Sequence, residues 1–518
     1  MRKYLIIAFL LPVSLFAQQQ TGKIDKMLTI FNDVVRQLDI NYVDTLNYED
    51  MTEVAINQML RKVDPYTVYF PKKKDEDLRM LTTGKYGGIG AIIQLREVSG
   101  KGKDTTQIII ANPYEGKPAQ RNDVLAGDVI LSVDGVSARN KSVSDVSQLL
   151  RGVPGSTVKL ELSRNGKTIT REFEREDIHL EPVDYYDIID GVGYIGFSEF
   201  TEGSAKDFKA ALDDLVNNRH AKGVIIDLRG NGGGIIDEAI QIVSNFVPKG
   251  TTVVSTKGKI HVANNTYSTS QEPAYPTLPV VVLVDKNSAS ASEIVSGSLQ
   301  DLKRATIIGQ RTFGKGLVQN LRPIAYDGHL KVTTSKYYLP SGRCIQAIDY
   351  NEIHKGKKVE KDTAGGILPD IVLSDSQKVD IAYTLYAKHY FFDYSVQYHR
   401  WHYFAPFPEK FEVTDEDISD FCRFLEEQNF TYETETSKFF ADMIEMAEME
   451  DIDPETLAAL KALEPKLKPS FQEAIQRNID EIREFLGAEI MERFYFQKGR
   501  IAYQLRFDKE LKRALEEF

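Results

Sequence analysis

Two short apolar runs, each followed by small residues and then by a helical pattern, constrain the fold most strongly. The first covers 223–227 and leads into the glycine-rich stretch 230–234 and a helical pattern over 235–246. The second covers 280–284 and leads into the serine-rich stretch 285–292 and a helical pattern to about residue 302. Fully apolar strands that alternate with helices are typical of a parallel sheet. Functional groups in such folds gather where strands end and helices begin.

The length of 518 residues exceeds what one hydrophobic core supports, so several domains are expected. The residue pattern of the sequence changes at four points, which predicts an α/β multidomain fold. Its expected parts are a signal peptide (1–17), an N-terminal helical segment (18–84), a β-rich module (85–175), an α/β core (176–375) and a charged helical extension (376–518). Thr414 and Asp453 are candidate N-caps within the extension.

The first residues have the pattern of an export signal. Arg2 and Lys3 precede an apolar stretch over 4–16, and Ala17 precedes three glutamines. Such a stretch is short for a membrane-spanning helix and typical of a cleaved signal peptide. We therefore expect an exported, periplasmic protein, and the alternative is a membrane-associated one that keeps this segment as an anchor.

Charge and cysteine content exclude several classes of protein. There are 76 acidic and 64 basic residues, a net charge of −12, and no long basic block, which argues against a general nucleic-acid binder. Only Cys344 and Cys422 are present, so a disulfide scaffold is excluded. Neither cysteine has partners at metal-ligand spacing, and we expect no structural zinc and no metal at the functional site.

Ser290 is the strongest candidate nucleophile. It follows the apolar run 280–284 and opens a helical pattern, where the helix N-terminus favours negative charge that develops nearby. Taken alone, Ser290 better suits a helix N-cap or a small-residue packing position, and Ser288 and Ser292 are better candidates for such a structural role. The glycine stretch 230–234 leaves backbone N–H groups open to a substrate.

A serine hydroxyl needs a base to become nucleophilic. None of the eight histidines stands in a comparable strand-end setting, whereas Lys315 lies between Gly314 and Gly316. Burial that lowers its pKa from about 10.4 toward neutrality would make this lysine a base.

Two nucleotide-binding patterns compete with this interpretation. Residues 309–315 satisfy most of a phosphate-binding loop, but Gly316 stands where that loop needs Ser or Thr. The stretch 230–234 resembles part of a dinucleotide fingerprint, but Ile235 replaces its final small residue. Both patterns are therefore incomplete.

These segments together resemble the C-terminal processing peptidases, the tail-specific family of Ser–Lys proteases that carry a PDZ domain. The resemblance covers roughly 25–375 and rests on N-S-A-S-A-S-E-I around Ser290, F-G-K-G around Lys315, and the order of these motifs with Gln319. It implies that Ser290 is the nucleophile, Lys315 the general base and Gln319 the residue that orients the lysine. It also implies an oxyanion hole made by the backbone N–H of Ala291 and of Gly233 or Gly234.

The same resemblance implies a crotonase-like or Clp-protease-like core over 176–375 and a PDZ domain over 85–175. A PDZ domain binds an extended peptide as an added strand, with the terminal carboxylate near Gly88, Ile89 and Gly90. The implied function is an exported serine endopeptidase that recognises the accessible C-termini of proteins or peptides and needs no cofactor. The alternative is a non-catalytic, PDZ-bearing adaptor. The helices of 376–518 have no counterpart in minimal relatives, and we expect them to form a homo-oligomer or to dock a partner.

Overall fold

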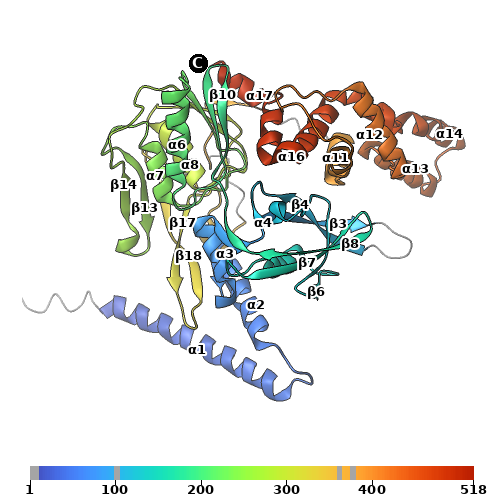
Figure 1. Cartoon of the computed structure of the whole chain (residues 1–518). Helices are drawn as coiled ribbons and strands as arrows, with labels where there is room; N and C mark the ends of the chain where they lie inside the picture. Colours follow the sequence, from blue (N-terminus) through green and yellow to red (C-terminus); the bar gives the residue numbers. More distant parts are fainter. Residues whose placement is uncertain (1–10, 99–104, 359–364, 374–380) are drawn as a thin grey trace, which may run out of the picture.

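The computed structural model describes residues 11–98, 105–358, 365–373 and 381–518, and the parts follow one another along the chain as Figure 1 shows. The predicted signal peptide (1–17) lies largely outside the described residues, so its cleavage stays a prediction. In these ranges, no helix is both long and apolar enough to cross a membrane.

The N-terminal segment is helical, as predicted. It contains α1 (Leu11–Asn41), α2 (Tyr48–Arg61), η2 (Lys72–Lys74) and α3 (Asp75–Thr83). Between α2 and η2, the short strand β1 (Val68–Phe70) pairs antiparallel with β18 (His329–Tyr338) of the core. This pairing brings the residues just before β1 next to the functional site.

The β-rich module is a five-stranded antiparallel sheet with a small side strand. Apolar and polar residues alternate along β7, and the apolar ones are buried, which is the pattern of a strand with one face on a core. Its elements are β3 (Ala91–Val98), β4 (Thr105–Pro113), α4 (Pro118–Arg121), β5 (Val129–Val133), β6 (Val136–Ser137), α5 (Val143–Leu150), β7 (Thr157–Arg164) and β8 (Lys167–Glu174). The antiparallel pair β2 (Lys85–Gly88) and β9 (Glu176–His179) joins the two ends of the module.

The α/β core is built on a six-stranded sheet. Its strands, in spatial order, are β10 (Val183–Ile189), β11 (Val192–Phe197), β12 (Val224–Asp227), β15 (Val280–Val284), β16 (Thr306–Gly309) and β19 (Ile371–Val372). All neighbours from β11 to β19 pair in parallel, which confirms the predicted parallel sheet. One face packs against α6 (Ser204–Asp213), α7 (Ile236–Val243) and α8 (Ala291–Asp301).

A second sheet of the core carries part of the site. Besides β1 and β18, it contains β13 (Thr252–Gly258), β14 (Asn265–Ser268) and β17 (Leu317–Pro323). The strand order is β1-β18-β13-β14, with β17 paired to β18. The other helical elements of the core are η3 (Asp214–Asn218), η4 (His261–Ala263) and α9 (Tyr350–His354).

The C-terminal extension is helical, and Thr414 and Asp453 cap α12 and α14 as predicted. Its elements are α10 (Ile381–Ala387), α11 (Tyr390–Trp401), α12 (Asp415–Glu427), α13 (Glu435–Met449), α14 (Pro454–Leu463), η5 (Glu464–Leu467), α15 (Phe471–Arg477), α16 (Ile479–Leu505) and α17 (Lys509–Leu515). Helices α10, α11, α12, α15 and α16 share an aromatic core of their own, and α17 returns to the central sheet (Figure 1). There Leu511 and Ala514 pack on the face opposite α6, α7 and α8. The end of the extension therefore covers the second face of the central sheet, a role that the sequence did not suggest.

Candidate active site

Ser290 lies at the turn between β15 and α8. Its backbone φ of 56° is uncommon for a residue other than glycine and is strained. The turn is held because the Ser290 N–H donates to Glu293 and the Ser290 carbonyl accepts from the Tyr337 hydroxyl. The hydroxyls of Ser288 and Ser292 donate to the backbone carbonyls of Leu228 and Asn231, which is the structural role expected of them.

One cavity of about 730 Å³ collects most of the predicted site residues. Its lining includes Ser290, Lys315, Gln319, Gly233 and Gly234. These residues come from the turn after β15, the loop before β17, β17 itself and the loop after β12. The fold therefore brings together segments that are far apart in the sequence.

Lys315 is largely enclosed in this cavity. Its Nζ lies 4.6 Å from the centroid of the Tyr66 ring. Burial, and then repulsion from Lys331, lower the pKa of Lys315 to about 8, although Glu293 and Asp64 act in the opposite direction. A pKa in this range leaves a useful fraction of neutral amine near neutral pH, as a general base needs.

The Tyr66 ring belongs to the N-terminal segment, just before β1. Asp64 holds this segment, because its carboxylate accepts from the backbone N–H groups of Tyr66 and Thr67 at 2.8 and 2.7 Å. The Thr67 N–H and hydroxyl both bond Asp64, and the Thr67 hydroxyl accepts from the Thr333 N–H. No local pattern in the sequence marks these residues, since only the β1–β18 pairing places them beside Lys315.

Gln319 lies on β17, four residues after Lys315. Its side-chain amide donates to the Thr333 hydroxyl at 3.2 Å. Within the described residues, no hydrogen bond joins Gln319 to Lys315. The predicted role of Gln319 in orienting the lysine therefore stays a prediction.

The backbone N–H groups expected to form the oxyanion hole differ in availability. Ala291 is the first residue of α8, and in the described part of the chain its N–H has no hydrogen-bond partner. The Gly233 N–H already donates to the Asn231 side chain at 2.9 Å, whereas the Gly234 N–H has no partner among these residues. A Cβ at Gly233 would lie 2.7 Å from the Cβ of Ser290, so only glycine allows this close approach. Gly233 thus makes the close approach to Ser290, and Gly234 has the N–H without a partner among these residues, so the choice of donor between them stays a prediction.

Glu293 is the central residue of the site that was not predicted from the sequence. Its side chain is fully buried and accepts four hydrogen bonds. One oxygen, Oε2, accepts from the backbone N–H of Ser290 at 2.8 Å and of Lys315 at 2.9 Å. The other oxygen, Oε1, accepts from the Thr312 hydroxyl at 2.6 Å and the Gly314 N–H at 2.8 Å.

Burial raises the pKa of the Glu293 carboxyl, and these four hydrogen bonds oppose that rise. A single carboxylate thus fixes the distance between the turn that carries Ser290 and the loop that carries Lys315. The signal in the sequence was a serine followed three residues later by glutamate at a helix start.

A smaller cavity of about 210 Å³ lies in the β-rich module. Its lining includes Gly88 and Ile89 and residues of β3 and α5, but not Gly90. Arg151, at the end of α5, pairs with Asp77 of α3 and lies over the Tyr86 ring. Peptide binding by Gly88, Ile89 and Gly90 stays a prediction.

The described residues hold no group of three or more His, Cys, Asp or Glu side chains that could bind a metal ion. The expectation that the enzyme needs no cofactor stays a prediction.

Family models match three consecutive parts of the chain. They are a PDZ domain over 87–174, "Peptidase family S41" over 191–372, and "Probable PDZ-protease, C-terminal helical domain" over 381–518. The carboxy-terminal-processing protease of Bartonella bacilliformis is 34% identical over 354 residues, which cover 67% of this chain and 75% of that protein.

A "Probable CtpA-like serine protease" of Staphylococcus aureus is 33% identical over 342 residues, which cover 64% of this chain and 66% of that protein. A solved structure of a photosystem II D1 C-terminal processing protease is 28% identical, with a TM-score of 0.38, over 66% of this chain and 86% of that one. The matches to a PDZ domain and to a peptidase family place the chain in the class of PDZ-bearing proteases. The chain belongs to peptidase family S41 and is a serine protease of the carboxy-terminal-processing type.

Proposed function

We propose that the protein is an endopeptidase in which Ser290 attacks the peptide bond and neutral Lys315 takes its proton. One observation carries this proposal. The backbone N–H groups of Ser290 and Lys315 share the same oxygen of Glu293, and both residues line one cavity. The pKa of about 8 for Lys315 supports its role as the base.

In the proposed mechanism, Lys315 removes the proton of the Ser290 hydroxyl as the serine oxygen attacks the substrate carbonyl. The Ala291 and Gly234 N–H groups donate to the resulting oxyanion, each worth roughly 3–4 kcal/mol in related chemistry. The Lys315 ammonium then gives its proton to the leaving amine. Water attacks the acyl-enzyme with the same lysine as base, which restores Ser290.

We propose that the substrate enters by its C-terminus, bound in the PDZ domain. Three neighbouring cavities support such a route. Tyr114 and Leu180 line both the cavity of the β-rich module and a cavity of about 390 Å³ between the module, the core and α16. Ser198 and Glu199 line both this middle cavity and the cavity of Ser290. An extended peptide that follows these cavities passes from the PDZ domain to the nucleophile.

Two peptides that differ only at their C-terminus test this route. We expect the peptide with a free carboxylate to be cleaved with a kcat/KM about tenfold above that of its C-terminal amide, because hydrogen bonds to a charged group are the stronger ones. The measurement is the steady-state cleavage rate of each peptide by the full chain. Equal kcat/KM values for the two peptides would contradict recognition of the carboxylate.

We further propose that the protein is exported to the periplasm and loses residues 1–17. The basic, apolar and small-residue order of this segment supports export. A protein isolated from the cell that still begins at Met1 would contradict the cleavage.

A further inference from the structure

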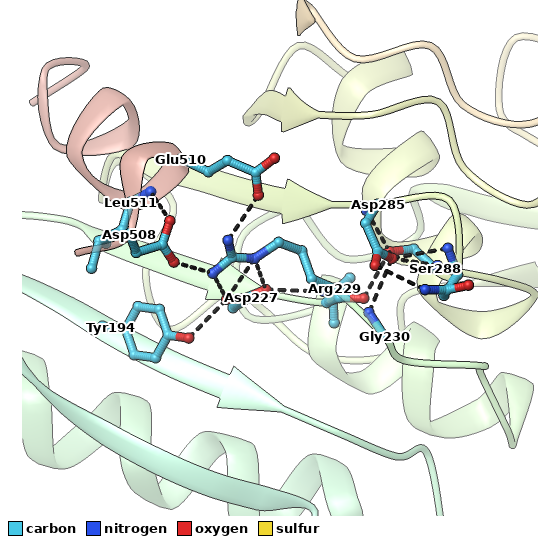
Figure 2. A network of polar contacts seen from close by, with 11 residues as sticks. Tyr194, Asp227, Arg229, Gly230, Asp285, Ser288, Asp508, Glu510 and Leu511 are labelled. Carbon is cyan, nitrogen blue, oxygen red and sulfur yellow. Dashed lines mark hydrogen bonds and ion pairs between the residues drawn. The ribbon is translucent and has the colours of Figure 1, made fainter. Parts of the chain in front are cut away.

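A partly buried ion network joins the C-terminal extension to the loop over residues 230–234 of the core, called the glycine loop below (Figure 2). The Arg229 guanidinium lies 2.6 Å from the Asp508 carboxylate and 2.7 Å from the Glu510 carboxylate. Its Nε also donates to both oxygens of Asp227 at 3.0 Å, and the Tyr194 hydroxyl donates to Asp227 at 2.7 Å. Two of the three acids around Arg229 thus come from the extension.

The ion pairs of Arg229 also fix the position of the glycine loop, because Arg229 directly precedes this loop in the sequence. The backbone N–H of Arg229 donates to Asp227 at 2.9 Å, and the N–H of Gly230 donates to Asp285 at 3.0 Å. Asp285 in turn accepts from the N–H and hydroxyl of Ser288 (Figure 2). The network therefore fixes the start of the glycine loop against the segment that carries Ser290.

The glycine loop and the serine segment also contact each other directly. The Asn231 carbonyl accepts from the Ala289 N–H at 3.0 Å and from the Ser292 hydroxyl at 2.9 Å. A shift of the loop at Arg229 would move the Gly234 N–H relative to Ser290. Catalytic donors must be held within a fraction of an ångström of their productive place, so such a shift lowers the rate.

We infer that Asp508 and Glu510 are positioning residues, which hold the glycine loop through Arg229, so that the C-terminal extension completes the active site. This inference rests on the proposed function, since it assigns Gly234 to the oxyanion hole. Arginine suits the role, because its planar fork binds two carboxylates in fixed directions.

The packing of α17 does not depend on these charges. Leu511 and Ala514 anchor the helix on the sheet. The Asp508 carboxylate also caps α17, since it accepts from the Leu511 N–H at 2.9 Å, and asparagine caps a helix about as well as aspartate. Asp508→Asn with Glu510→Gln therefore removes two charges from the network and leaves the helix in place.

The test compares this double variant with the wild-type chain in peptide cleavage, pH profile and thermal unfolding. We expect kcat to fall about tenfold or more, with KM changed by no more than about twofold, because a misplaced donor affects the transition state. The midpoint of the pH profile should not move, since neither acid is among the groups that shift the pKa of Lys315. Glu517→Gln is the matched control, because Glu517 pairs with Arg513 at the far end of α17, and it should keep the wild-type kcat.

An unchanged kcat in the folded double variant would overturn the inference. A loss of activity that is fully explained by a smaller fraction of folded protein would overturn it as well. If the double variant does not fold, Glu510→Gln alone, which leaves the cap intact, decides by the same measurements. A wild-type chain without Ser290-dependent cleavage would instead contradict the proposed function. The two failures are thus distinguishable.

Discussion

Lys315→Ala is expected to abolish peptide-bond cleavage and to leave the protein folded. Without a base, the Ser290 hydroxyl remains a poor nucleophile, and removing one member of such a unit costs about 10⁴-fold or more in kcat. Ser290→Ala should have a similar effect, and the double variant should be no worse than either single one, because the two residues act together. The measurements are kcat on a peptide substrate and the thermal unfolding of each variant.

Lys331→Met is a useful control for the loss of a positive charge from the same cavity. Lys331 repels the Lys315 ammonium and lowers the pKa of Lys315. Its removal should therefore raise that pKa and shift the pH profile upward without abolishing cleavage. A Lys315→Ala variant with near-normal activity would contradict the role of this lysine as base.

Glu293→Ala is expected to cost both stability and activity. The carboxylate accepts from Ser290, Thr312, Gly314 and Lys315, and its loss leaves buried donors without a partner. Each such donor costs about 1–3 kcal/mol, so the free energy of unfolding should fall by at least about 3 kcal/mol. Glu293→Gln should also be impaired, because one end of an amide cannot accept hydrogen bonds.

The matched control is Glu238→Ala, in a second buried acid that binds backbone N–H groups. Glu238 accepts from the N–H groups of Gly203 and Ala205 at the start of α6, and no hydrogen bond among the described residues joins it to Ser290 or Lys315. Its variant should lose stability, while the folded fraction keeps its kcat. Chemical denaturation and active-site titration measure the two effects. Wild-type stability and activity in Glu293→Gln would contradict the role given to Glu293.

The central strands and the main site segments could be predicted because their signals are local. β15 is a short, fully apolar run, β12 is apolar up to its last residue, Asp227, and both strands are buried along their whole length. Ser290 and Lys315 stand in distinctive small-residue segments, and the order of these segments along the chain, which resembles that of a known protease family, led to the proposed pair. These segments surround one cavity because the carboxyl ends of parallel strands lie at the same edge of the sheet.

The remaining parts of the site depend on contacts between segments that are far apart in the sequence. Tyr66 approaches Lys315 only because β1 pairs with β18. The helical pattern of α17 predicts an apolar face, but it does not predict that this face covers the central sheet. In the same way, the pairing of Arg229 with Asp508 crosses about half the chain, and no local pattern marks it.

The central claim is that neutral Lys315 activates Ser290, and the pH dependence of covalent labelling tests it most directly. A fluorophosphonate probe reacts with an activated serine, and mass spectrometry of the digest locates the label. We predict labelling at Ser290 with a rate that rises about tenfold per pH unit below the midpoint, because only the unprotonated amine is a base. The midpoint should lie near pH 8, the pKa of Lys315, and the rate should level off above it. A labelling rate that stays flat from about pH 5 to about pH 9, or a label on another residue, would contradict the claim.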